Sequence, residues 1–132
     1  MRVRNTSKYP TDEIKVLLDF ASGGIDTRDF WVCVDNRVFS GKLGSYRKDA
    51  ELLGEGGRLF QPIVWKRIFI HLGKPLSSEY RIRKDWRRQL IYVSAHEFRH
   101  AQRIQDEKDA HSYARKVLKT WTVAQGKRGN SA

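Results

Sequence analysis

Residues 84–102, KDWRRQLIYVSAHEFRHAQ, decide how this chain folds and where its chemistry lies. Side chains at steps of three and four residues share one face of a helix, and in this stretch they are Trp86, Leu90, Val93, Glu97 and His100. The apolar members of that face predict that the helix packs against the protein core. The polar members at its C-terminal end are therefore turned toward the core side as well.

The polar end of this helix carries the pattern HExxH, as His96-Glu97-Phe98-Arg99-His100. Four residues make about one helical turn, so both imidazoles project from one face and can bind one Zn²⁺. Glu97 lies next to the first of them and can act as the general base on a water that the metal activates. Two histidines that face the core without a ligand are harder to satisfy, so the pattern favours a zinc site over two surface histidines.

A catalytic zinc site needs a third protein ligand, with one position left for water. Candidate side chains follow soon after the motif, at Asp106, Glu107, Asp109 and His111. If the helix continued straight, Glu107 would lie about 10 Å further along the axis than His100, out of reach of the same ion. A zinc site therefore requires the chain to break between Gln102 and Asp106.

The residues around the motif resemble those of the gluzincins. The segment 95–102, AHEFRHAQ, followed by 107–114, EKDAHSYA, is similar to the gluzincin arrangement of HExxH and a later helix of the form E-x-x-A-D/N-x-(aromatic)-A. The whole chain resembles the minigluzincin-like metallopeptidases, small single domains whose sheet has an edge strand just before the active-site helix. The motifs cover roughly residues 61–121, and before them only the order of elements is alike.

This resemblance implies roles for residues after the motif. Glu107 is the expected third zinc ligand, and Asp109 is the alternative, since some zincins use the acid directly before the alanine. Tyr113 is expected to donate a hydrogen bond to the oxyanion of the substrate. His111 stands where the family usually has Asp or Asn, a residue that supports a ligand histidine.

Asp106 is a further candidate for the third ligand. It falls at the third-ligand position of the metzincin pattern HExxHxxGxxH/D, but Arg103 stands where that pattern has the glycine that makes the turn. The order of expectation is therefore Glu107, then Asp109, then Asp106.

The remaining pattern predicts a small α+β domain over residues 1–125, and the resemblance implies a zincin-like fold with a short, mostly antiparallel sheet. The expected elements are an arm over 1–9, a helix from Thr11 stopped by Gly23-Gly24, a hairpin of 30–34 and 37–40, loops over 41–57, a strand over 61–72, a C-terminal helix, and a disordered tail over 126–132. The resemblance implies that 61–72 is the edge strand and that the C-terminal helix carries the third ligand. A peptide or protein substrate is expected to lie along the edge strand.

The charge of the chain adds one further class of partner. Lys and Arg number 26 against 15 Asp and Glu, and residues 67–132 hold 15 basic and 6 acidic side chains, a difference of +9. A field of this sign attracts polyanions, so nucleic acid is a candidate partner. No apolar run approaches the roughly 18 residues of a membrane span, and no apolar segment follows the basic start, so we expect no membrane partner and a cytoplasmic location.

These observations predict a zinc-dependent metallopeptidase that hydrolyses peptide bonds by metal-activated water. Two alternatives stay open. The first is a degenerate zincin-fold binding module that has lost the chemistry. The second is a basic, nucleic-acid-associated protease that acts on proteins bound to DNA or RNA.

Overall fold

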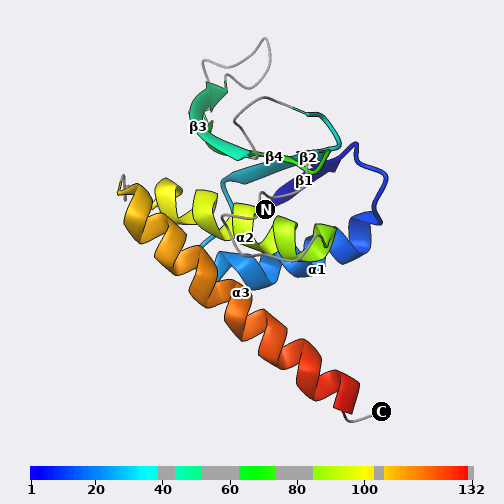
Figure 1. The fold of residues 1–132 in the computed structure, drawn as a ribbon. Coiled ribbons are helices and arrows are strands. Elements are labelled where there is room, and N and C mark those ends of the chain that lie inside the picture. The colour runs from blue at the N-terminus through cyan, green and yellow to red at the C-terminus, as the bar shows by residue number, and fades with distance from the viewer. Residues whose placement is uncertain (39–43, 52–62, 74–84, 103–105, 131–132) are drawn as a thin grey trace.

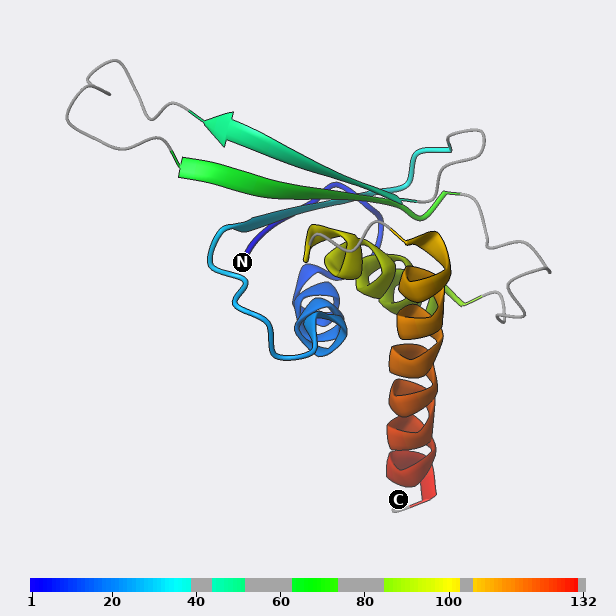
Figure 2. The ribbon, with the colours of Figure 1, turned by 90° about the vertical axis from the view of Figure 1, so that its left-hand side faces the viewer.

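The computed structural model describes residues 1–38, 44–51, 63–73, 85–102 and 106–130. Within these ranges the elements are β1 (Arg2–Asn5), α1 (Thr11–Ser22), β2 (Phe30–Asp35), β3 (Gly44–Glu51), β4 (Ile63–His71), α2 (Trp86–Ala101) and α3 (Glu107–Asn130). The helices lie on one side of the sheet (Figures 1 and 2), which confirms the α+β class. None of the helices in the described part combines the length and apolar character that crossing a membrane requires.

The sheet is mixed, and its strand order is β1-β2-β4-β3. The β1–β2 and β2–β4 pairs are parallel, and only β3–β4 is antiparallel. The prediction of a mostly antiparallel sheet is therefore wrong. Parallel neighbours need a crossover connection, and α1 provides it between β1 and β2. The predicted hairpin is wrong for the same reason, because parallel strands flank β2 on both sides, and of the expected return strand 37–40 only 37–38 are described, outside any strand.

Two strands form where the sequence predicts no regular structure. β1 falls within the expected N-terminal arm, and Val3 packs against the core beside β2. β3 falls within the expected loop region and pairs with β4 from Gly44–Ile70 to Glu51–Ile63. The edge next to the HExxH helix is therefore β3, and residues 63–71 of the expected edge strand form the interior strand β4. Both missed strands lie at the edges of the described sheet and carry few apolar residues, so the sequence shows no clear strand pattern there.

Helix α1 forms as its apolar stripe predicts. Its buried residues include Ile14, Leu17, Leu18 and Ala21. Gly23 ends the helix with a left-handed φ of 64°, a conformation that glycine adopts without a Cβ clash. The N-cap position is Pro10, and the hydroxyl of Thr11, the first residue of the helix, accepts a hydrogen bond from the Asn5 amide at 3.0 Å.

The core lies between the sheet and α2. Phe30 of β2 and Phe98 of α2 are both buried and meet edge-to-face, with ring centroids 5.2 Å apart. Leu90 and Ile91 of α2 are also completely buried. This burial holds the HExxH helix against the inner face of the sheet, so the orientation of its polar end is set by the core.

The chain breaks between α2 and α3, as a zinc site requires. Helix α2 ends at Ala101, and Gln102 closes it with its backbone N–H on the last carbonyls. Asp106 begins the next helix by accepting the backbone N–H of Lys108 at 2.9 Å. Helix α3 then runs to Asn130, with Trp121 buried against the core. Helix α3 therefore includes residues 126–130 of the segment expected to form a tail.

Gly44 lets the edge strand β3 approach α2 closely. A Cβ atom at this position would collide with Cγ1 of Val93 and would lie 3.1 Å from the Phe69 carbonyl oxygen. We expect Gly44→Ala to lower the free energy of unfolding by about 1–3 kcal/mol, the usual cost of overpacking, in chemical denaturation. The matched control is Gly126→Ala in α3, where the new methyl group meets nothing within 4 Å. This control should stabilise the protein by about 0.5–1 kcal/mol, and equal stability of the Gly44→Ala protein would contradict the close approach.

Candidate metal centre

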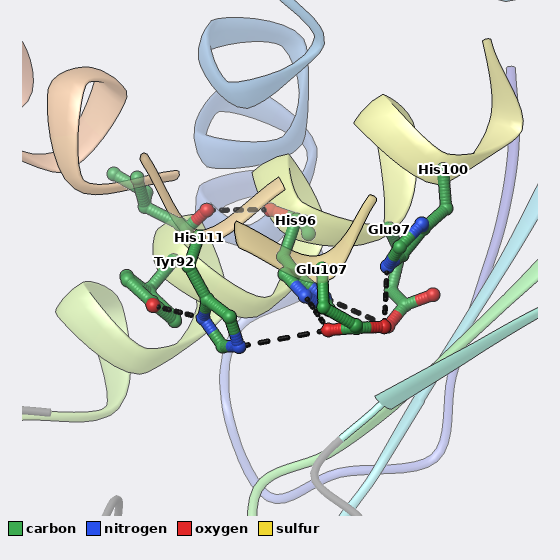
Figure 3. A network of polar contacts seen from close by, with 8 residues as sticks. Tyr92, His96, Glu97, His100, Glu107 and His111 are labelled. Carbon is green, nitrogen blue, oxygen red and sulfur yellow. Dashed lines mark hydrogen bonds and ion pairs between the residues drawn. The ribbon is translucent and has the colours of Figure 1, made fainter. Parts of the chain in front are cut away.

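Helix α2 presents His96 and His100 one turn apart at its C-terminal end. Their rings lie 4.6 Å apart and at 90° to one another. Both side chains are largely shielded, with 14% and 12% of their surface exposed. The start of α3 faces them (Figure 3).

Glu107, the first residue of α3, brings a carboxylate to both histidines. Its Oε2 lies 3.0 Å from Nε2 of His96, and its Oε1 lies 2.9 Å from Nε2 of His100. The break after Ala101 makes this possible, because α3 returns alongside α2 instead of continuing its axis. His111, one turn further along α3, places its Nε2 3.6 Å from Oε2 of the same carboxylate.

The donor atoms have the spacing of metal ligands. A tetrahedral zinc ion with bonds of about 2.0–2.1 Å holds its donors about 3.3 Å apart, and the contacts of Glu107 with His96 and His100 fall within a few tenths of an ångström of this value. Imidazole nitrogen and carboxylate oxygen are donors that zinc accepts. The donor types and these two contacts are compatible with a zinc ion, and among the described residues those whose donor atoms all lie within 4.8 Å of one another are His96, Glu107 and His111.

Glu97 lies between this cluster and the edge strand. The side chain is buried, and its Oε1 lies 3.2 Å from Nδ1 of His96. On its other side, its Cγ would lie 3.4 Å from a Cβ atom at Gly44. A carboxylate in this place can contact both a group held by the histidines and a chain lying along β3.

The charges of the cluster shift the pKa values of its members. Burial favours the neutral ring of His96, but hydrogen bonds to Glu97 and Glu107 and their charges outweigh it and raise the pKa of His96. Burial would raise the pKa of Glu107, but the hydrogen bond and charge of His96, with the charge of His100, lower it. Burial, followed by the charge of His96, lowers the pKa of His111. Because zinc binds the unprotonated ring, protons and zinc compete for His96.

The two other acids expected as ligands lie elsewhere. Oδ2 of Asp109 lies 2.8 Å from Nε of Arg99, which holds this carboxylate in an ion pair. Asp106 is exposed and bonds to the backbone at the start of α3. Of the three candidate acids, the structure brings only Glu107 to the histidines.

The structure does not bring Tyr113 into the cluster. Its hydroxyl lies at the end of α1, only 2.6 Å from where a Cβ atom on Gly23 would be, and its ring packs against the core beneath the guanidinium of Arg99. Tyr113 thus packs in the contact with α1, and none of its contacts with the described residues joins it to the cluster, so its expected role as oxyanion donor stays a prediction.

The tyrosine that does reach the cluster is Tyr92, which sequence reasoning missed. Its hydroxyl lies 2.5 Å from Nδ1 of His111 (Figure 3). The sequence feature that could have pointed to this contact was the spacing, because Tyr92 precedes His96 by one turn just as Glu107 precedes His111 by one turn. That spacing is common in helices, and nothing in the sequence pairs one helix with the other.

Comparisons of the chain with models of protein families, with curated proteins and with solved structures find no match. The resemblance to the minigluzincin-like metallopeptidases therefore rests on the quoted residues. The class of the protein is accordingly a proposal.

Proposed function

We propose that this chain is a zinc-dependent metallopeptidase. The observation that carries the proposal is the meeting of one carboxylate, that of Glu107, with the Nε2 atoms of His96 and His100 at 3.0 and 2.9 Å. These groups come from two helices, and a turn in the chain is needed to unite them. A solvated helix surface does not require such an arrangement, whereas a metal site does.

The residues divide into those that hold the ion and one that moves protons. His96, His100 and Glu107 would hold the zinc ion, which supplies a Lewis acid that lowers the pKa of water and polarises a carbonyl. Glu97 would accept the proton of the attacking water and return it to the leaving amine. Its burial next to His96 favours this role, because a shielded carboxylate is held in place and is little screened by solvent.

The substrate would lie extended along β3. Among the described strands β3 pairs only with β4, so its other edge has backbone groups that can add a strand. Gly44 of β3 packs beside Glu97, which would bring a bound peptide bond toward the proposed base. The substrate would therefore lie along β3 and not along the expected strand 61–72.

Zinc removal tests the proposed function. Purified without chelators, the chain should carry a single zinc ion and hydrolyse an unfolded protein substrate. A chelator should abolish hydrolysis, and added zinc should restore it. Because protons compete for His96, whose pKa is raised, zinc affinity measured by calorimetry should fall as the pH is lowered from about 8 to about 6.

The outcomes separate the alternatives. Zinc uptake without hydrolysis of any substrate would favour the degenerate zincin-fold binding module. Failure to take up zinc at either pH would contradict the metal site itself.

A further inference from the structure

His111 faces the same carboxylate oxygen as His96. Its Nε2 lies 3.6 Å from Oε2 of Glu107, and its ring centroid lies 4.5 Å from that of His96, with the rings tilted by 40°. The donor atoms that His96, Glu107 and His111 can offer all lie within 4.8 Å of one another. The third imidazole therefore borders the position that a metal ion would take between the first histidine and the carboxylate.

Tyr92 holds the ring of His111 in this orientation. The tyrosine is almost completely buried, at 3% exposed, so its hydroxyl has a fixed position 2.5 Å from Nδ1 of His111. A metal-binding histidine donates the N–H of its other ring nitrogen to a neighbouring acceptor, which leaves the ligating nitrogen unprotonated. The hydroxyl oxygen of Tyr92 can accept this N–H, and in that arrangement Nε2 of His111 is directed at the cluster without a proton.

The spacing also fits direct ligation. Donor atoms around a tetrahedral zinc ion lie about 3.3 Å apart, and Nε2 of His111 exceeds this distance from the Glu107 oxygen by only a few tenths of an ångström. An aspartate or asparagine at position 111 has a shorter side chain, so the length of the imidazole is what brings a donor this far.

We propose that His111 is a fourth protein ligand of the metal ion. The site would then hold the ion with His96, Glu107 and His111, whose donor atoms lie within 4.8 Å of one another, and with His100, which contacts the other oxygen of the Glu107 carboxylate. This inference rests on the proposed function only in that it requires the ion. Because four protein donors would fill the usual coordination number of zinc, His111 would also restrict the access of water to the ion.

The test measures metal binding and not activity. His111→Ala and His111→Asn should each weaken zinc binding by about 10–100-fold in competition with a chromophoric chelator. Both variants should also change the visible spectrum of the cobalt-substituted protein, because a protein nitrogen leaves the metal. Tyr92→Phe, which removes only the hydroxyl, should weaken binding by about tenfold or less. The control is Ser112→Ala, an exposed neighbour on α3, which should change neither quantity.

The asparagine variant separates ligation from a supporting role. Asparagine can still donate a hydrogen bond to a neighbouring side chain, so an unchanged affinity and cobalt spectrum in His111→Asn would overturn direct ligation. If Glu107→Ala weakens zinc binding and His111→Asn does not, only this inference fails. If neither substitution changes zinc binding, the proposed function fails with it.

Discussion

Replacing Glu107 with alanine is expected to weaken zinc binding by about 100-fold or more, while Asp109→Ala leaves it within about twofold. The carboxylate of Glu107 contacts Nε2 of both His96 and His100, so its loss removes the group that links the two helices at the site. Asp109 lies two residues away on the same helix, but its carboxylate is held by Arg99. Each variant removes one carboxylate from nearly the same place on α3. A difference between them therefore shows which carboxylate binds the ion.

The measurement is a competition titration with a chromophoric zinc chelator on both variants. The Glu107 side chain is 67% exposed, so its removal leaves the packed core untouched, and circular dichroism should confirm the fold. Asp106→Ala provides a second comparison and should also keep its zinc. A larger loss of affinity in Asp109→Ala than in Glu107→Ala would show that a different turn conformation places the ligand.

Replacing Glu97 with glutamine is expected to lower the rate of hydrolysis by about 10²–10⁴-fold, while zinc stays bound. The carbonyl oxygen of glutamine can accept the hydrogen bond that Oε1 of Glu97 accepts from Nδ1 of His96, so the ligand ring keeps its orientation. The amide cannot accept a proton from water at neutral pH, so the general base is lost. The substitution thereby separates metal binding from chemistry.

The measurement combines zinc stoichiometry with the rate of cleavage of the same unfolded substrate. Glu13→Gln is the matched control, because this glutamate forms its ion pair with Arg87 at the opposite end of α2 and should be dispensable for hydrolysis. Retained hydrolysis in Glu97→Gln would overturn the role of the general base. Loss of zinc from Glu97→Gln would instead mean that the charge of Glu97 is needed to hold His96 in place.

The helices could be predicted because their signals are local. The stripe Ile14, Leu17, Leu18 and Ala21 is buried in α1 as its spacing predicts, and Gly23 ends that helix. The face of α2 that carries the HExxH motif follows from the same periodicity. The edge strand β3, GSYRKDAE, could not be predicted, because it has few apolar residues and is stabilised by its pairing with the next strand, β4.

The ligand candidates also separate what local sequence signals predict from what only the packing of elements decides. His96 and His100 share a face through helical geometry alone, so their pairing follows from four residues of spacing. The choice of Glu107 over Asp106 and Asp109 depends on the direction of α3 after the turn, and no local pattern reports this direction. The contact of Tyr92 with His111 likewise exists only once the two helices pack.

The amino-acid sequence by itself thus determined the HExxH helix, its buried face and the need for a break before the third ligand, because each depends on neighbours within a turn or two. The tertiary structure alone decided which acid meets the imidazoles, which strand forms the edge beside Glu97, and that a third histidine faces the same carboxylate. These depend on how separate elements pack, which is set by the burial of a shared core and not by the spacing of residues along any one element.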